Sequence, residues 1–597
     1  MKTLFFILVF ISFQIIVSAQ KFYFRGEVQD EAGNPLPNVT IQPQKTGYLF
    51  KTGASGTFGI VLENSTDTLS FSLEGFCKTN MLASADNYIR IKLKKMSSSA
   101  VRRDKLLSLT KDLRREDQKE WYTGNETYAS LLENHFVNAK RFPNTGMSLN
   151  VDRASYSNIR RFISLKSFVP PDAVRIEEML NYFNLNYKEP EKGQLFSART
   201  KISSCPWNPE SQLFFVNLSS AKLDLDSLPP SHLVFLIDVS GSMDMPNRLP
   251  LLKSSFRLLV NNLRDKDSVA IVVYGGLTGV MLNTTSGAEK EKIFKAIDEL
   301  EPGGATPGES GIKLAYSVAR NHFIKGGNNR VILATDGDFN VGLKTENELD
   351  SLITAQKESG IYLTCLGVGM GNYKDSKIQT LAQNGNGNFS YLDSYNEAEK
   401  VLLKEFTQTL YSVADGVYMN VEFNPEYVKE YRLIGFDNKV SALRDTLSMV
   451  EGGEIGSGHS MVAMFEIIPT EKNITAIKSG SADVAVANIK MNYNLPRQSK
   501  EYVFTYRCPL NFSSFEQLDK SYWFSTAVSM FGALLRESKF IRSTSFDDII
   551  KIGTTAINPN DLSQKEFLNL VDQAKKLYSK TKKKKEKDND KKDRKSN

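Results

Sequence analysis

Residues 233–242 read LVFLIDVSGS, and this stretch decides the fold. Its five apolar residues, Leu233–Ile237, predict a buried strand, and Asp238, Ser240 and Ser242 follow at the end of that strand. A continuously apolar strand is typical of a parallel sheet that is covered on both faces. In such α/β sheets, ligands bind beyond the carboxyl ends of the strands. The stretch therefore predicts an α/β domain with a polar site after this strand.

The sequence on either side supplies the other layers of that domain. Further apolar strands are predicted at Val269–Tyr274, Val331–Ala334, Ile361–Val368 and Phe389–Leu392. Amphipathic runs lie between them, and one has apolar residues at helical spacing, namely Leu252, Phe256, Leu259, Val260 and Leu263. Over residues 228–410 this alternation indicates a doubly wound, Rossmann-like parallel sheet.

Two further oxygen donors complete a candidate metal site. Thr306 lies in the glycine-rich loop GGATPGESG, and Asp336 follows the strand predicted at Val331–Ala334. An all-oxygen set of ligands suits a hard ion such as Mg²⁺, or Mn²⁺ or Ca²⁺, and not zinc. Two carboxylates balance the charge of a divalent ion, so the bound ion stays able to accept a carboxylate from another molecule. By its chemistry, this arrangement is a binding device.

The DxSxS motif, the glycine-flanked threonine and the later aspartate together resemble the metal-ion-dependent adhesion site of von Willebrand factor type A (VWA) domains. The segments LKSSFRLLVNNL, GGNNRVILATDGDFNVG and LGVGMGNYKDSKIQTLAQNGNGNFSYLD extend the resemblance along the domain. The resemblance implies that the metal ligands, some of them acting through water, are Asp238, Ser240, Ser242, Thr306 and Asp336. The alternative is a polar turn cluster that binds no metal.

The regions around the VWA-like unit resemble the other domains of one bacterial VWA architecture. Residues 20–95 are strand-like, and GEVQDEAGNPLPNVTI resembles the carboxypeptidase regulatory-like domain, which implies a prealbumin-like β-sandwich. Residues 121–227, predicted to be helical first and extended later, contain SLNVDRASYSNIRRFI and resemble the VWA-associated N-terminal domain. Residues 96–120 are predicted to be a linker.

Residues 411–512 return to a strand pattern and resemble the uncharacterised C-terminal domain of the same family, for example in VEFNPEYVKEYRLIGFDN. Residues 513–578 are predicted to be helical. The strand-like segments SARTKISS and SQLFFVNLSS, which precede the α/β unit, need partners, as do the strands that follow it. We therefore expect the α/β unit to be inserted into a discontinuous β-sandwich domain.

The two ends of the chain indicate its compartment and the origin of its charge. Residues 1–19 read as an export signal, with Lys2, a mainly apolar Leu4–Val17 and a small-residue cleavage pattern. That apolar stretch is shorter than the roughly 20 residues that a spanning helix needs. We expect an exported protein, periplasmic or associated with the cell envelope, with no transmembrane span after signal removal.

The net charge of +7 over 597 residues comes from the C-terminal end. Positions 575–595 hold twelve lysine or arginine residues and four acidic ones, a net of +8, so the rest of the chain carries −1. A nearly neutral body argues against a nucleic-acid partner. Residues 579–597 are predicted to be a disordered, solvated tail, and the alternative is a weak contact with anionic lipid or polymer.

Other chemistries find little support in the sequence. The four cysteines lie far apart in the sequence; Cys365 is predicted to be a buried thiol, and Cys205–Cys508 is the pair that we expect if a disulfide forms. The sequence contains no GxxxxGK[ST] loop and no GxSxG elbow. The histidines are isolated in the sequence, and His459 in GSGHS is predicted to have a turn or core role.

The predicted function is therefore binding without catalysis. We expect an exported envelope protein whose metal accepts a carboxylate from a protein partner, in an adhesion or assembly role. One alternative is an envelope scaffold whose metal only stabilises the fold, and a more remote one is a hydrolase, for which the sequence displays no nucleophile–base pair. The identity of the partner, the ion and the oligomeric state stay open.

Overall fold

The computed structural model describes two compact units, one within residues 1–103 and one within residues 104–597. The described residues are 22–31, 33–46, 49–73, 76, 78–94, 126, 128–149, 151–185, 188–224, 226, 228–275, 278–304, 308–337, 353, 360–369, 375–385, 387–405, 408, 410–436, 438–439, 453–480, 484–496, 498, 500–541 and 543–593. The expected export signal and the expected linker lie outside these residues.

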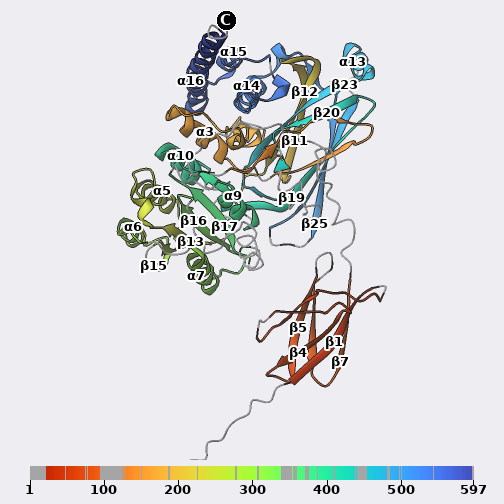
Figure 1. Ribbon diagram of the computed structural model, residues 1–597, viewed down its shortest axis with the longest axis vertical. Helices are drawn as coiled ribbons and strands as arrows, with labels where there is room; N and C mark the ends of the chain where they lie inside the picture. Colours follow the sequence, from red (N-terminus) through yellow and green to blue (C-terminus); the bar gives the residue numbers. More distant parts are fainter. Residues whose placement is uncertain are drawn as a thin grey trace, which may run out of the picture. The chain divides into compact units, whose positions relative to one another are not determined.

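The first unit consists of two β-sheets packed on one core (Figure 1). Its strands are β1 (Phe22–Asp30), β2 (Thr40–Pro43), β3 (Phe50–Lys51), β4 (Thr57–Leu62), β5 (Thr66–Ser72), β6 (Thr79–Ser84) and β7 (Tyr88–Leu93). They are ordered β4-β1-β7 in one sheet and β3-β2-β5-β6 in the other. Alternate residues of β4 and β7 are buried, as expected for strands with one face on a core.

The α/β unit contains a six-stranded sheet, so the predicted mixed α/β architecture is confirmed. Its strands are β13 (Ser231–Asp238), β14 (Ser268–Tyr274), β15 (Gly279–Ser286), β16 (Asn328–Thr335), β17 (Tyr362–Gly367) and β18 (Phe389–Tyr391), in the order β15-β14-β13-β16-β17-β18. The edge strand β15 was not predicted and runs antiparallel to β14. The connection from β14 to β15 is too short for the crossover that parallel pairing requires.

Helices cover both faces of this sheet (Figure 1). The helices α5 (Leu249–Asn261), α6 (Lys290–Asp298) and α10 (Tyr395–Glu399) contribute to the core on one face, and α7 (Gly308–Asn321) and α9 (Asp375–Asn384) to the core on the other. The helix expected around Phe256 is α5, and the ring of Phe256 stacks on that of Phe235 with 4.3 Å between centroids.

The rest of the second unit is built on two β-sheets that combine strands from before and after the α/β unit. The strands are β8 (Leu131–Leu132), β9 (Val137–Asn138), β10 (Asn144–Ser148), β11 (Phe196–Cys205), β12 (Asn208–Ser220), β19 (Ser412–Phe423), β20 (Val428–Ile434), β21 (Asn438–Lys439), β22 (Gly453–Gly456), β23 (Ser460–Pro469), β24 (Ala485–Asn494), β25 (Glu501–Pro509) and β26 (Phe512–Ser513). One sheet has the order β26-β11-β12-β23-β20-β9, and the other has the order β10-β19-β24-β25 with β22 also paired to β19, while β8 and β21 form a separate two-stranded sheet. The pairings β12–β23 and β10–β19 therefore join segments that the α/β unit separates in the sequence.

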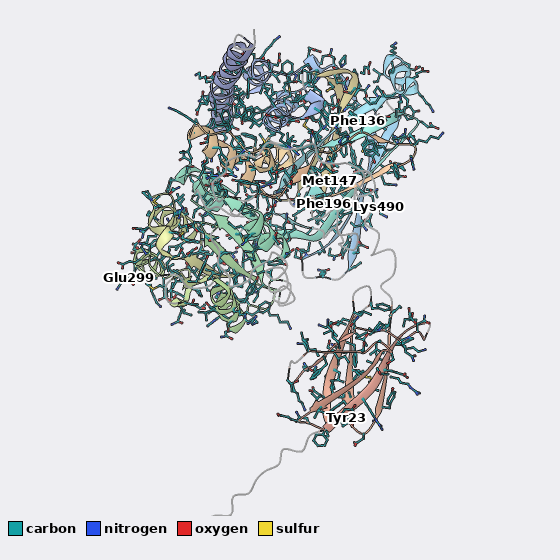
Figure 2. All side chains as sticks on the ribbon, in the orientation of Figure 1. Tyr23, Phe136, Met147, Phe196, Glu299 and Lys490 are labelled. Carbon is teal, nitrogen blue, oxygen red and sulfur yellow. The ribbon has the colours of Figure 1, made fainter. Side chains whose placement is uncertain are left out.

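Both faces of β12 are covered, which explains why its last ten residues are all buried. Phe214 lies in the core between the two sheets, together with Met147 and Phe196, which Figure 2 labels. The neighbouring Phe215 lies in a second core that the helices form on the opposite face. These helices are α3 (Ala154–Ser164), α4 (Ile176–Leu180), α14 (Lys520–Leu535), α15 (Phe546–Ala556) and α16 (Leu562–Asp593), which confirms the predicted C-terminal helices.

Two predictions of secondary structure are wrong. Residues 121 to about 200 were expected to be helical and then extended, an order that α3, α4 and β11 follow, but residues 131–148 contain the unexpected short strands β8, β9 and β10. The tail from residue 579 was expected to be disordered, but α16 continues to Asp593. Lysine and glutamate are good helix formers, and extending a helix whose first turns are already packed avoids the cost of nucleation.

Cys205 and Cys508, the pair that we expected if a disulfide formed, are not bonded to each other. Both residues are free thiols, as is Cys365, which is buried as predicted. Cys205 belongs to the core under the helices, whereas Cys508 belongs to the core between the two sheets. Burial raises the pKa of each of these two thiols to about 12, so both stay protonated.

Candidate metal site

The DxSxS motif lies where the strand order of the α/β sheet reverses. The strand β13 pairs in parallel with β14 on one side and with β16 on the other. The chain leaves β13 toward β14 and β15 and later returns to the other side at β16. Asp238 ends β13 and Asp336 directly follows β16, so both carboxylates lie at the carboxyl ends of adjacent strands. This topological switch point is the common ligand site of open α/β sheets.

The carboxylate of Asp238 is fixed by three donors. Its Oδ1 accepts a hydrogen bond from the backbone N of Ser240 at 2.9 Å. Its Oδ2 accepts from the hydroxyls of Tyr274 at 3.2 Å and Thr335 at 3.1 Å. The hydroxyl oxygens of Ser240 and Ser242 are 3.0 Å apart. The turn after β13 thus brings one carboxylate and two hydroxyls together.

The second carboxylate is close enough to act on the first. Burial and, to a smaller extent, the charge of Asp336 raise the pKa of Asp238 to about 6, against the hydrogen bonds from Ser240 and Thr335, which lower it. Both side chains are almost completely buried, with residue exposures of 1% and 2%. Two buried carboxylates that repel each other attract a cation.

That cation is a guanidinium in this structure. Nη1 of Arg248 donates to Asp336 Oδ2 at 2.5 Å and to the carbonyl oxygen of Ser242 at 2.6 Å. Arg248 lies just before α5, and α5 begins soon after the motif. Sequence reasoning missed this residue, because nothing in the local pattern ties Arg248 to an aspartate 88 positions away.

Glycines bring the threonine loop and the motif close together. Gly303 N donates to the carbonyl oxygen of Val239 at 2.6 Å, and Gly241 N donates to that of Gly304 at 3.3 Å. Thr306 itself lies outside the described residues. The structure therefore brings together Asp238, Ser240, Ser242 and Asp336, and places the start of the threonine loop beside the turn that carries the two serines.

Another glycine is required under the motif. Gly275 has a φ of +104°, and a Cβ at this position would lie 2.3 Å from the backbone N of Ser240. Only glycine tolerates both the backbone angle and the close approach. The residue that follows β14 thus packs directly against the backbone of the turn that carries Ser240.

The residues present fit a hard divalent ion by their chemistry. Two carboxylates and two hydroxyls are oxygen donors, and one of the carboxylates, that of Asp336, already binds a cationic side chain. Within the described part of the chain, no group of three or more His, Cys, Asp or Glu side chains could hold a metal ion. A site at Asp238 therefore depends on its hydroxyls as well as on its two carboxylates.

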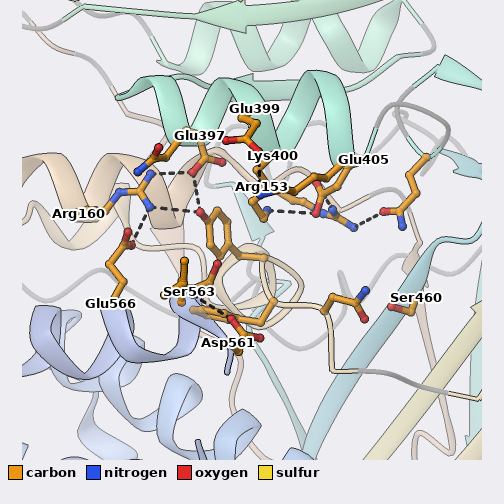
Figure 3. A pocket seen from close by; sticks show the side chains of 17 residues that line it. Arg153, Arg160, Glu397, Glu399, Lys400, Glu405, Ser460, Asp561, Ser563 and Glu566 are labelled. Atoms are coloured by element: carbon orange, nitrogen blue, oxygen red, sulfur yellow. Dashed lines mark hydrogen bonds and ion pairs between the residues drawn. The ribbon is translucent and has the colours of Figure 1, made fainter. Parts of the chain in front are cut away.

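A second polar site lies where three segments of the second unit meet. A cavity of about 370 Å³ is lined by residues of α3, the short helix at Lys400–Lys404 and the start of α16 (Figure 3). The four arginine and lysine residues of its lining are each in an ion pair with a lining carboxylate, namely Arg153, Arg160, Lys400 and Lys404. The positive charges of this lining are therefore satisfied within the protein.

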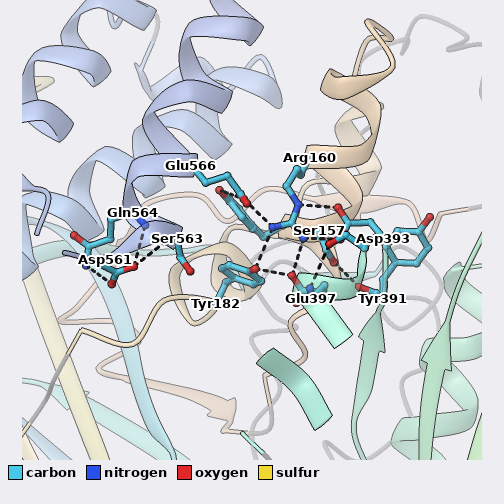
Figure 4. A network of polar contacts seen from close by, with 12 residues as sticks. Ser157, Arg160, Tyr182, Tyr391, Asp393, Glu397, Asp561, Ser563, Gln564 and Glu566 are labelled. Carbon is cyan, nitrogen blue, oxygen red and sulfur yellow. Dashed lines mark hydrogen bonds and ion pairs between the residues drawn. The ribbon is translucent and has the colours of Figure 1, made fainter. Parts of the chain in front are cut away.

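Arg160 is the centre of the network at this cavity (Figure 4). Its guanidinium binds Asp393 at 2.5 Å and Glu397 at 2.7 Å, both in the α/β unit, and Glu566 of α16 at 2.7 Å. Tyr182 adds a hydrogen bond to Glu397 at 2.6 Å. One side chain of α3 therefore ties the α/β unit to the C-terminal helices.

His459 has the structural role that its sequence context predicted. It follows the turn after β22, where its backbone N donates to Ser220 Oγ at 2.9 Å. Its Nδ1 lies 3.5 Å from Arg153 Nη2. Burial and the charge of Arg153 lower the pKa of His459 to about 3, so the ring is neutral.

The matches to known families agree with this architecture. Residues 232–407 match the family described as von Willebrand factor type A domain, residues 122–214 the one described as von Willebrand factor, and residues 408–577 the one described as Uncharacterized protein YfbK, C-terminal. The fold and these matches define a VWA-domain protein with a YfbK-type C-terminal domain. The "Uncharacterized protein YfbK" of Escherichia coli (strain K12) is 36% identical over 472 residues, which cover 76% of this chain and 81% of that protein. The chain belongs to the YfbK family.

Two solved structures are more distant. The von Willebrand factor type A protein from Catenulispora acidiphila is 12% identical, with a TM-score of 0.38, and the match covers 60% of this chain and 86% of that one. The ArnB paralog VWA2 from Sulfolobus acidocaldarius is 14% identical, with a TM-score of 0.34, and covers 65% and 98%. In this chain, no helix among the described residues is both long and apolar enough to cross a membrane.

Proposed function

We propose that this chain is an exported protein of the cell envelope that binds a protein partner through a divalent metal ion in its VWA domain. Its role is adhesion or assembly, without catalysis. The observation that carries the proposal is the meeting of Asp238, Ser240, Ser242 and Asp336 at the switch point of the sheet. Export rests on the signal-like residues 1–19.

Asp238, Ser240, Ser242, Thr306 and Asp336 would hold Mg²⁺, Mn²⁺ or Ca²⁺, some of them through water. The ion would supply an electrophilic centre that accepts a carboxylate oxygen of the partner. This chain's own residues orient the site, since Tyr274 and Thr335 fix the carboxylate of Asp238. In the same proposal, residues 20–95 form a prealbumin-like, carboxypeptidase regulatory-like domain that takes no part in metal binding.

The proposal is tested by crosslinking in native envelopes with Mg²⁺ or with EDTA, followed by identification of the captured proteins. We expect a set of partners that is lost with EDTA and in Asp238→Ala. The matched control is Asp298→Ala, because Asp298 is an exposed carboxylate at the end of α6 in the same domain. An Asp238→Ala variant that keeps every partner of the wild type would rule the proposal out.

The envelope-scaffold alternative gives a different outcome in the same experiment. The support for it is that Asp238 and Asp336 are buried, so a bound ion would also stabilise the fold. In that case EDTA lowers the melting temperature but releases no partner.

A further inference from the structure

The side chain of Arg248 lies inside the proposed metal site. Its Nη1 bridges Asp336 Oδ2, at 2.5 Å, and the carbonyl oxygen of Ser242, at 2.6 Å. The side chain of Arg248 is 11% exposed and that of Asp336 is 1% exposed. A nearly buried guanidinium therefore connects the DxSxS turn with the aspartate that follows β16.

The fold leaves space for this arginine on its other side. Gly369 follows β17 and has a φ of +77°, and a Cβ there would lie 2.6 Å from Nε of Arg248 and 3.0 Å from its Cγ. The carbonyl oxygen of Gly369 accepts a hydrogen bond from the hydroxyl of Tyr391, which holds this backbone in place. A residue larger than glycine would collide with the arginine.

We propose that Arg248 is a resident counter-cation of the site, which neutralises Asp336 when no metal is bound and weakens the binding of the divalent ion. This inference rests on the proposed function, since it concerns the same metal site. A divalent ion at Asp336 must share the carboxylate with the guanidinium or displace it, and like charges a few ångströms apart repel strongly in a buried site.

The same charge decides which ligand the loaded site prefers. Asp238, Asp336 and Arg248 together carry −1, so a bound divalent ion changes the local charge to +1. A loaded site of that charge attracts an anionic group, whereas the unloaded site repels it. Arg248 therefore makes the loaded site cationic instead of neutral, which strengthens its attraction for an acidic partner, and it raises the metal concentration at which the site loads.

The test is calorimetric titration of the full-length protein with Mg²⁺ and with Mn²⁺ at constant ionic strength. We expect Arg248→Gln to bind either ion at least about tenfold more tightly than the wild type, because a positive charge next to the ion is removed. Arg248→Lys keeps the charge and should stay within about threefold of the wild type. The matched control is Arg257→Gln, since Arg257 lies on α5 in an exposed pair with Asp298.

The outcomes separate this inference from the proposed function. If the wild type and Arg248→Gln bind the metal with equal affinity, the inference alone is overturned. The same holds if Arg248→Gln and Arg248→Lys raise the metal affinity by the same factor. Tight binding by Arg248→Gln with none by the wild type supports the inference and overturns the metal-dependent function of the native chain. If neither protein binds, both are overturned.

A measurement on the wild type covers the case in which Arg248→Gln does not fold. The arginine side-chain Nε–H signal of Arg248 in ¹⁵N NMR, assigned with Arg248→Lys, should shift during the Mg²⁺ titration. Its midpoint should coincide with the calorimetric one. A signal that stays unchanged at saturating metal would show that the guanidinium does not respond to the ion.

Discussion

At the residue scale, the candidate site depends on a few positions where the backbone angle and close packing allow only glycine. Gly275 is one of them, since its φ of +104° and its approach to Ser240 both require glycine. The carboxylate of Asp238 is oriented by the turn that this glycine supports. Replacement of the glycine therefore acts on the metal site through the backbone.

We expect Gly275→Ala to lower the free energy of unfolding by about 2–4 kcal/mol, because it combines a strained φ with a steric overlap. Metal affinity should fall at least about tenfold, since the amide of Ser240 would move away from Asp238. Urea denaturation and calorimetric titration measure the two effects. Gly279→Ala is the control, because a Cβ at Gly279 meets nothing within 4 Å; equal effects of the two variants would contradict this account.

A buried acid beside the sheet gives a second prediction at this scale. Asp152 accepts a hydrogen bond from the backbone N of Phe389 at 2.9 Å. Burial and the charge of Glu178 raise the pKa of Asp152 to about 7. Because its pKa is about 3.8 in the unfolded chain, the folded state binds the extra proton between about pH 4 and pH 7.

Stability from Asp152 is therefore present at low pH and is lost as the pH rises through about 7. The side chain in Asp152→Asn cannot ionise, so the variant does not share the wild type's loss of stability with rising pH. The free energy of unfolding of the variant minus that of the wild type should therefore rise by about 2–4 kcal/mol from pH 4.5 to pH 8. Denaturant titrations at several pH values measure this difference. A difference that is constant with pH would show that the carboxyl is ionised throughout.

At the element scale, helix α3 connects parts of the chain that are distant in sequence. Arg160 on α3 binds Asp393 and Glu397 of the α/β unit and Glu566 of α16. Arg175 forms a second buried link, to Asp375 at the start of α9, at 2.7 Å. Polar contacts of this kind hold the α/β unit against the helical layer.

We expect Arg160→Met to lower the free energy of unfolding by about 3–5 kcal/mol, because it leaves the mostly buried Asp393 and Glu397, as well as the more exposed Glu566, without their cation. Hydrogen exchange should speed up in α10 and at the start of α16, where those carboxylates lie. Arg257→Met removes an exposed ion pair and should cost less than about 1 kcal/mol. A loss of stability without faster exchange in both helices would argue against the connecting role.

The sequence predicted those elements whose signals are local. The apolar run before Asp238 and the motif after it were enough for β13 and its site. The edge strand β15 was missed because half of its residues are polar, as an edge permits. Cys205 and Cys508 could not be placed in separate cores from the sequence, because the face of a sheet that a cysteine occupies depends on strand register, which spacing does not reveal. Arg248 and Arg160 were missed because their acidic partners are 88 or more positions away.

At the scale of the whole molecule, the chain divides into two compact units. The apolar core of the first unit runs from Phe24 to Leu93 and includes no residue of the second. In the second unit, each of the two large sheets combines strands from before and after the inserted α/β unit, because β12 pairs with β23 and β10 with β19. Unfolding the α/β unit should therefore also disturb the sheets and helices that it contacts.

We expect scanning calorimetry of the full chain to resolve two transitions, one for each unit. Magnesium at about 100 times its dissociation constant should stabilise the second unit by about 2.7 kcal/mol, a rise in melting temperature of about 2–3 °C for a unit of this size. The transition of the first unit should not move, since its core has no part in the site. Deletion of residues 1–103 should leave the metal-dependent shift unchanged, and Asp238→Asn should abolish it. Two outcomes would show that the units are coupled and that the N-terminal unit takes part in the metal site. One is a magnesium-dependent shift of the first unit's transition, and the other is loss of the second unit's shift when residues 1–103 are deleted.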